Sequence, residues 1–181
     1  LEYFLDRIDR KTRLVPYDPR TWLFLDWTGL FKDGYSAVYN LWLLITLDRM
    51  AALAGIAGHR EWAGALEAWA RDLRVSLAGL LDAQGLVRDG IRWDGTIVDT
   101  TSIHAQTLAI IAGLNPKSEK AMIDKVLLPF VRGRETPAVR PSAYWITYVF
   151  EVLADRGYGA EVAACIRERW APMVAHGTTF E

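Results

Sequence analysis

The chain has 181 residues, of which 51% are hydrophobic and 24% are charged, so it is long and apolar enough to bury a substantial core. Its formal net charge is −1, and its basic residues are scattered among acidic ones rather than gathered in a run. That distribution excludes the basic patch expected of a protein that binds nucleic acid. We therefore expect no nucleic acid among its partners.

The sequence also argues against a membrane span, a disulfide and a metal site. The longest apolar run, residues 37–47, is interrupted by Asn40 and Thr46 and is followed by Asp48, so it is too short to cross a bilayer. The one cysteine, Cys165, cannot form an internal disulfide, and we expect it to be a small buried apolar side chain. Because the three histidines lie far apart without HxxxH spacing, we expect neither a metal ion nor another cofactor.

Three stretches, in chain order, predict helical hairpins. The sequences "MAALAGIAGHREWAGAL", "QTLAIIAGLNPKSEKAM" and "VFEVLADRGYGAEVAACI" each join an apolar helix to a second helix through a short turn, which contains Gly58, Gly113 or Gly157. Glycine suits the left-handed residue that commonly ends a helix. The hairpins follow one another at roughly fifty residues, a spacing in the range of helical repeats.

The two helices of a hairpin differ in how their apolar residues are distributed. Residues 38–53 leave almost no polar face, which is typical of a helix covered on all sides. Residues 61–80 place apolar side chains at spacings of three and four, with charged side chains around the rest of the helix. This pattern is typical of a helix with one solvent-exposed face. We therefore expect inner helices covered by outer ones. Tryptophans at helical spacings are expected in the core: Trp42, Trp62, Trp69, Trp145 and Trp170.

Consecutive pairs of inner and outer helices predict an all-α fold, in which helical hairpins form part of an (α/α)6 toroid or barrel with short irregular or β segments in the loops. A solenoid would give the same pattern, so closure of the ring stays open at this point. The chain begins inside a helical pattern, "LEYFLDRIDRKT", without an initiator methionine. We interpret residues 1–181 as a single domain that is a fragment, the later hairpins, of a larger helical domain.

Irregular segments enter the inner helices and carry the residues that could bind or react. Because such loops meet at one mouth of a ring, we expect a site assembled from them. Carboxylates and aromatic side chains dominate these loops and the terminal loop: Asp26, Trp27, Asp33, Trp93, Asp94, Asp99, Glu135, Arg140, Tyr144, Thr178, Thr179 and Glu181. This mixture suits a carbohydrate, since sugar rings lie on aromatic planes and glycosidic bonds are cleaved by paired carboxylates.

Each candidate also has a purely structural interpretation. Trp27 and Trp93 could anchor loops in the core. Asp26 and Asp94 could cap or form turns, since "DW" and "WDG" are ordinary turn sequences. His104, near the start of an inner helix, could be a hydrogen-bonded structural residue instead of part of the mouth.

The order of three segments resembles a known family. The chain contains "WLFLDWTGLFKDGYSAVYNLWLLITLDRMAALAGIAGH", then "WDGTIVDTTSIHAQTLAIIAGL", then "PSAYWITYVFEVLADRGYGAEVAACIRERWAPMVAHGTTFE". Together they resemble the later part of the six-hairpin catalytic domain of bacterial α-L-rhamnosidases, the inverting enzymes of glycoside hydrolase family 78. The most specific piece is the end, where a helix leads into a glycine, two threonines and a glutamate.

The resemblance implies roles for individual residues. In that family the terminal glutamate is the general base that activates water, and this role falls on Glu181. The family's Asp-Trp loop matches Asp26 and Trp27, and the aromatic wall of the rhamnose pocket falls on Trp27 and Trp93. We expect these three residues, with His104 at the mouth, to contact the carbohydrate substrate.

The family's general acid lies in a motif of the type D-x-x-x-R-E followed by G-W-x-G-D, and neither half occurs in residues 1–181. The resemblance therefore implies a parent protein that hydrolyses terminal α-L-rhamnosides and an isolated chain that is inactive. A toroidal glycosidase with another sugar specificity, and a non-catalytic helical carbohydrate-binding or scaffold domain, are the alternatives. Unfilled surface on the inner helices of an incomplete ring would favour self-association.

Overall fold

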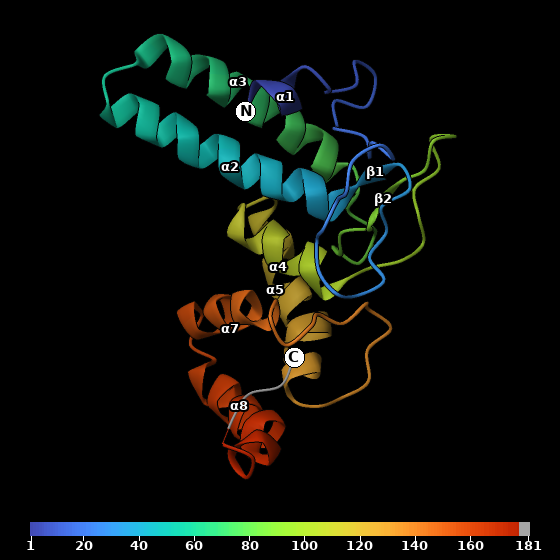
Figure 1. The fold of residues 1–181 in the computed structure, drawn as a ribbon, viewed down its shortest axis with the longest axis vertical. Coiled ribbons are helices and arrows are strands. Elements are labelled where there is room, and N and C mark those ends of the chain that lie inside the picture. Colours follow the sequence, from blue (N-terminus) through green and yellow to red (C-terminus); the bar gives the residue numbers. More distant parts are fainter. Residues whose placement is uncertain (178–181) are drawn as a thin grey trace.

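The computed structural model describes residues 1–177 of the chain, which form helices with one small sheet in the loops (Figure 1). The predicted all-α fold class is confirmed. The elements in chain order are α1 (Glu2–Leu5), β1 (Tyr35–Ser36), α2 (Ala37–Ile56), α3 (Arg60–Ala78), β2 (Gly90–Ile91), α4 (Ile103–Ile111), α5 (Pro116–Met122), the π-helix η1 (Ile123–Leu127), α6 (Leu128–Val131), α7 (Ile146–Asp155) and α8 (Gly159–Val174).

The three predicted hairpins are α2–α3, α4–α5 and α7–α8. Gly58, Gly113 and Gly157 lie in their turns with φ of 83°, 56° and 86°, the left-handed conformation that glycine adopts without steric cost. The side chains of Ser36 and Ser102 accept hydrogen bonds from backbone N–H groups in the first turns of α2 and α4, so both inner helices begin at N-caps.

The hairpins are stacked in chain order along the long axis of the molecule (Figure 1). Helix α2 packs on α3 and α4, and α4 packs on α7. Residues 103–110 of α4 are all buried, as expected for an inner helix covered on every side. Outer helix α3 buries one face, with Leu66, Leu73 and Leu77 in the core.

Complete covering of the other two inner helices was a wrong expectation. Helix α7 buries one face only, and α2 ends in apolar residues that project from the molecule, with Ile56 84% exposed. The assignment of all five tryptophans to the core was also wrong. Trp145 is buried, whereas Trp62 is 49% exposed because nothing among the described residues packs on that face of α3. Cys165 is buried, as predicted.

Helix α2 is longer than the apolar run read from the sequence. Its 20 residues are long and apolar enough, by length and composition, to cross a membrane, so the argument that this segment is too short does not hold. However, 56% of its most apolar stretch is buried inside the chain, which is the pattern of a core helix.

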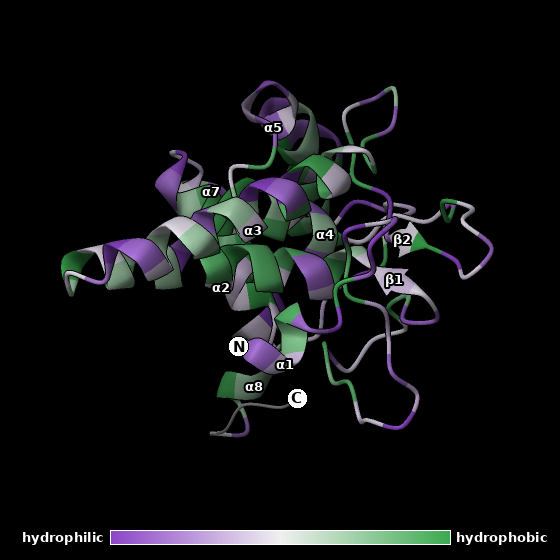
Figure 2. Ribbon diagram, turned by 90° about the horizontal axis from the view of Figure 1, so that it is seen from above, coloured by the Kyte–Doolittle hydropathy of each residue, from purple (hydrophilic) through white to green (hydrophobic). Residues whose placement is uncertain are grey.

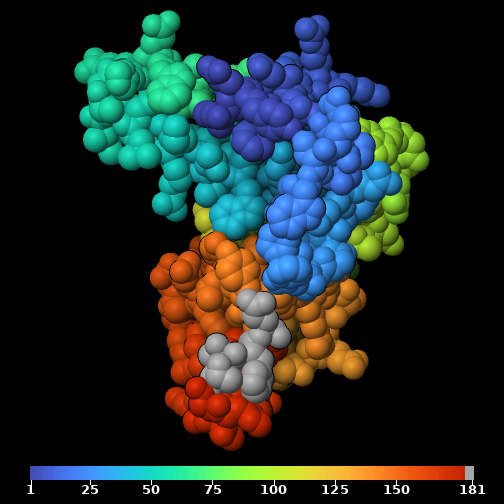
Figure 3. All heavy atoms as spheres, in the orientation of Figure 1, coloured from blue at the N-terminus to red at the C-terminus, as the bar shows by residue number. Residues whose placement is uncertain are grey.

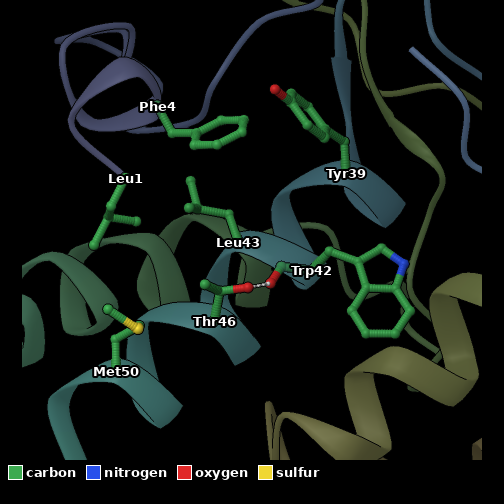
Figure 4. A pocket seen from close by; sticks show the side chains of 7 residues that line it. All are labelled: Leu1, Phe4, Tyr39, Trp42, Leu43, Thr46 and Met50. Carbon is green, nitrogen blue, oxygen red and sulfur yellow. Dashed lines mark hydrogen bonds between the residues drawn. The ribbon is translucent and has the colours of Figure 1, made fainter. Parts of the chain in front are cut away.

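An apolar groove runs between α1 and the first half of α2 (Figure 4). Its volume is about 310 Å³, and it is lined by Leu1, Phe4, Tyr39, Trp42, Leu43, Thr46 and Met50. The Thr46 hydroxyl donates a hydrogen bond of 2.8 Å to the Trp42 carbonyl, so the one hydroxyl-bearing aliphatic side chain here is already paired.

Self-association stays a prediction, and this groove is the open inner-helix surface on which it depends. We expect the 181-residue chain to sediment as a dimer or larger species at micromolar concentration in analytical ultracentrifugation. A single monomeric species over the whole accessible concentration range would contradict the expectation.

The loops that precede the inner helices lie together at one end of the hairpins, opposite the tip of α2–α3 (Figure 2). Strands β1 and β2 pair in an antiparallel manner, and Ser102 forms a bridge with Val139 of the segment before α7. The loops therefore gather at one end of the hairpins, as the sequence predicted, and we call this end the mouth. Gly34 and Gly90 allow this close pairing, because a Cβ on either one would lie 2.3 Å from a backbone oxygen of the opposite strand.

We expect Gly90→Ala to lower the free energy of unfolding by about 1–3 kcal/mol, since alanine is strained at φ 154° and its Cβ would collide with the Tyr35 carbonyl. Urea denaturation would measure the loss. Gly64→Ala is the matched control, because Gly64 is helical and a Cβ there meets no atom within 4 Å. It should be neutral or stabilising. If both variants lost the same free energy of unfolding, the close approach of Gly90 to the Tyr35 carbonyl would not be the cause of the loss.

Candidate functional site

A buried carboxylate, Asp26, connects its own loop to the first turn of α4 and to the segment before α7. Its Oδ2 accepts hydrogen bonds from His104 Nε2 at 2.7 Å and from the Ser142 backbone N–H at 2.8 Å. Its Oδ1 accepts from the Trp27 backbone N–H at 2.7 Å and from the Ser142 hydroxyl. Both carboxylate oxygens thus have two donors each.

The segment around residues 20–35 runs over one face of the molecule to reach the residues before α7 (Figure 3).

The protonation states of Asp26 and His104 follow from burial and hydrogen bonding. Burial raises the pKa of Asp26, but the hydrogen bonds from Ser142, His104 and Trp27 outweigh it and bring the pKa below its ordinary value. Burial lowers the pKa of His104 more than the nearby carboxylate raises it. The pair is therefore a carboxylate and a neutral imidazole. Since an ionised carboxylate can only accept, His104 Nε2 carries the proton.

The remaining contacts of His104 fix its ring. Its Nδ1 is buried without a hydrogen-bond partner among the described residues, and its ring packs against Trp145 with 4.3 Å between the centroids. Trp145 and Ser142 belong to the same turn, in which the Trp145 N–H donates to the Ser142 hydroxyl at 3.3 Å. The carboxylate, the imidazole and the turn before α7 form one connected unit.

A cavity of about 270 Å³ opens above this unit, and it is lined by Trp27, Ser142, Ala143 and Tyr144. The two aromatic side chains at its rim face solvent, with Trp27 70% and Tyr144 61% exposed. Both rings are therefore open to a ligand that enters the cavity. The cavity offers two aromatic surfaces and a hydroxyl held in place from below, a combination that suits a small polar ring.

The structure brings together three of the five residues expected at the site. Trp27 lines the cavity, whereas Asp26 and His104 lie beneath it, both fully buried. Both side chains are closed to solvent and lie below the cavity wall that Ser142 forms, so their contact with a sugar stays a prediction. Trp93 does not line this cavity, and Glu181 lies outside the described residues.

The surroundings of Trp93 fit the loop-anchoring interpretation. Its Nε1 donates a hydrogen bond of 2.6 Å to Asp33 Oδ1, and its ring lies 5.7 Å from that of Tyr35 between centroids. Asp94 closes the adjacent turn by accepting from the N–H and hydroxyl of Thr96. The contacts of Trp93 tie the loop after β2 to Asp33 and to β1.

Ser142 is the functional candidate that sequence reasoning missed. It lies in "RPSAYW", in the turn that leads into α7, whose N-cap is Trp145. The serine accepts a hydrogen bond from the Trp145 N–H, and its two bonds to Asp26 depend on a residue 116 positions away, which no local pattern indicates. Within residues 1–177, no three His, Cys, Asp or Glu side chains are placed to hold a metal ion together.

No known protein-family model and no curated protein sequence matches the chain. Two solved structures are similar over 98% of it. One is a GH78 family rhamnosidase of Bacillus sp. GL1, with a TM-score of 0.82, 23% sequence identity and 18% of that chain covered. The other is a rhamnosidase from Klebsiella oxytoca with rhamnose bound, with a TM-score of 0.73, 22% identity and 32% of that chain covered.

At these identities the likeness establishes the fold. The chain has the fold of a segment of these rhamnosidases, as the sequence resemblance implied, and it spans less than a third of the length of either protein.

Proposed function

We propose that residues 1–181 form part of the catalytic domain of a glycoside hydrolase that releases terminal α-L-rhamnose. The observation that carries the proposal is the cavity between Trp27 and Tyr144, in a chain with the fold of rhamnosidase segments. Below the cavity lies a carboxylate whose two oxygens each accept two hydrogen bonds. The two aromatic rims would hold the faces of a sugar ring, and Ser142 would face its hydroxyls.

The proposed mechanism is inversion. An acid protonates the leaving oxygen while a base deprotonates a water molecule on the opposite face of the sugar, with carboxyl groups about 6.5–9.5 Å apart. We assign the base to Glu181 from the family resemblance. The acid motif of the family is absent from residues 1–181, so we assign the acid to another part of the protein and expect the isolated chain to have no turnover.

The test is hydrolysis of an aryl α-L-rhamnoside by the full-length protein, beside aryl glucosides and fucosides. We expect Trp27→Ala to lower kcat/KM for the rhamnoside about tenfold, because an aromatic contact contributes about 1 kcal/mol beyond its buried area and a tenfold change is about 1.4 kcal/mol. Trp62→Ala is the matched control, since Trp62 is an exposed indole on α3 with no part in the cavity.

Several outcomes would contradict the proposal. Turnover of a glucoside or fucoside in place of the rhamnoside would keep the hydrolase and change the sugar. Saturable sugar binding without any turnover would favour a non-catalytic carbohydrate-binding domain. Equal activity in the Trp27 and Trp62 variants would show that the cavity does not hold the sugar.

A further inference from the structure

The segments that precede α2 and α4 are each fixed by a buried amide of the helix that follows them. The Asn40 side chain accepts a hydrogen bond from the Val15 N–H at 2.7 Å and donates one to the Val15 carbonyl at 3.0 Å. Gln106 binds Val87 in the same way, at 2.9 and 2.8 Å. Both amides are fully buried and stand four residues after the serine that caps their helix. Each of these helices therefore holds its own preceding segment.

The third inner helix has no amide at the corresponding position. Ser142 precedes α7 as Ser36 precedes α2, since the hydroxyl of each accepts from the N–H three residues further on. Four residues after Ser142 stands Ile146, whose side chain forms no hydrogen bond. Instead, Asp26 of the first loop accepts from the N–H and the hydroxyl of Ser142. The turn before α7 is therefore held by a neighbouring loop and not by its own helix.

The segment upstream of this turn is fixed through its backbone. The Val139 N–H donates to the Thr101 carbonyl at 2.9 Å, and the Val139 carbonyl accepts from the Ile103 N–H at 3.0 Å. Between Val139 and α7, the hydrogen bonds that the described residues make to other loops are those of Ser142 with Asp26. Loss of these bonds would therefore release the turn and leave the helices in place.

The side chains of Asp26, His104 and Ser142 form what we call the latch. It joins the loop that carries Trp27, whose N–H also donates to Asp26, to the turn that carries Tyr144. These two aromatic side chains are at the rim of the candidate sugar cavity. A closed latch therefore restricts the spacing of the two rings that a sugar would contact.

His104 is the member of the latch that can respond to pH near neutrality. Its Nε2 carries the proton in the closed latch, and its buried Nδ1 has no acceptor among the described residues, so a second proton would have no partner there. Asp26 is the charged group that acts on this ring, and α2, α5, α7 and η1, which also pack on α4, add no further charge among the described residues. The closed latch therefore takes up a proton less readily than an open one.

We propose that the latch controls the affinity of the candidate site for its sugar and that protonation of His104 opens it. The proposal rests on the proposed function and deepens it, because it names a regulation of the same cavity. His104 acts as a positioning residue, through Asp26 on one loop and through Trp145 on the turn.

The direction of the pH effect follows from linkage. An open latch exposes an ordinary histidine with a pKa near 6.5, whereas burial lowers the pKa of His104 in the closed latch. Each unit of pH below about 6.5 therefore favours the open form about tenfold, until the pH reaches the pKa of the closed form.

The first measurement is the KM for an aryl α-L-rhamnoside in the full-length protein at pH 7 and pH 4.5. We expect the wild-type KM to be about tenfold higher at pH 4.5, because a small displacement of contacting groups is enough for such a loss. His104→Gln keeps a donor for Asp26 and does not titrate, so its KM should change less than about twofold. His104→Leu removes the donor, so its KM should be about tenfold higher than that of the wild type already at pH 7.

Thr107→Val is the matched control on the same helix. Thr107 is fully buried one turn from His104, and its hydroxyl donates at 2.8 Å to the Ile103 carbonyl within α4. Its KM should follow that of the wild type at both pH values. If Thr107→Val raised KM at pH 7 as much as His104→Leu, general damage to α4 would explain the effect, and the latch would be overturned.

Hydrogen exchange tests the latch without any turnover. The backbone N–H groups of Trp27 and Ser142 both donate to Asp26, so their exchange with solvent reports its opening. Mass spectrometry of peptides that contain these residues should show faster exchange in the wild type than in His104→Gln at pH 4.5, and equal exchange at pH 7. Equal exchange in the two proteins at both pH values would overturn the latch.

The two measurements separate the latch from the proposed function. If the wild-type protein hydrolyses no glycoside, the proposed function fails, and the exchange difference alone supports or overturns the opening of the latch. If the rhamnoside is hydrolysed and KM depends on pH equally in the wild type and in His104→Gln, the proposed function stands and control of affinity by the latch is overturned.

Discussion

Asp26→Ala is expected to lower the free energy of unfolding by about 3–5 kcal/mol, because several buried donors would lose their acceptor and each such loss costs about 1–3 kcal/mol. The alanine would leave donors from His104, Ser142 and Trp27 without an acceptor in a place closed to solvent. It would also release the loop that carries Trp27 from the turn before α7. Urea denaturation followed by tryptophan fluorescence at pH 7 would measure the loss.

Asp94→Ala is the matched control, because Asp94 is an exposed turn residue whose carboxylate accepts local hydrogen bonds from Thr96. This substitution should lower the free energy of unfolding by no more than about 1 kcal/mol. Similar losses in the two variants would mean that the hydrogen bonds of Asp26 contribute no more than those of a surface turn.

Asp26 and His104 make the folded chain less stable as the pH falls. The pKa of His104 is lowered from 6.5 in the folded chain, so the unfolded chain takes up a proton that the folded chain refuses, and stability falls as pH drops below 6.5. The pKa of Asp26 is lowered from 3.8, so its contribution is present above pH 3.8 and is lost below it.

His104→Gln separates the two contributions, because the Gln Nε2 can still donate to Asp26 but does not titrate. We expect a flatter stability profile between pH 6.5 and 4.5 and the same loss below pH 4. If stability still fell as steeply between pH 6.5 and 4.5 in this variant, a group other than His104 would cause the loss in that range.

How much of this could be predicted from the sequence differs between the helices and the site. The hairpin turns at Gly58, Gly113 and Gly157 depend on local backbone conformation, which neighbouring residues determine, and all three were predicted. Coverage of a helix depends on its neighbours in space. Trp62 and Trp145 both follow helical spacing, yet only Trp145 meets a packed partner.

The candidate site was predictable only in part. The aspartate of "DW" and a histidine on an apolar helix were both visible signals, but their contact spans 78 residues, and no local pattern joins them. Local reasoning had no means to decide between contact with a sugar and a buried hydrogen bond, because both use the same residue types. Ser142 received no role from the sequence, and its hydrogen bonds to Asp26 became visible only when the loops were placed together.

Glu181→Gln is expected to lower kcat of the full-length protein on an aryl α-L-rhamnoside by about 10²–10⁴-fold, the contribution typical of a general base. Glutamine keeps the size of the side chain and loses the ability to take a proton from water. Sugar binding should persist, because the aromatic walls of the cavity are untouched, so KM should change little. Glu67→Gln makes the same chemical change on the exposed face of α3 and should leave kcat unaltered.

The stereochemistry of the product tests the role of that base independently of the rate. If Glu181 activates water on the face opposite the leaving group, the α-linked substrate must release the β anomer first, which proton NMR detects before the sugar mutarotates. Initial release of the α anomer would require a covalent intermediate and would make a carboxylate the nucleophile, so Glu181 could no longer be assigned as a base. A rate collapse together with inversion would assign Glu181 as the base, because neither a loop cap nor a nucleophile gives both results.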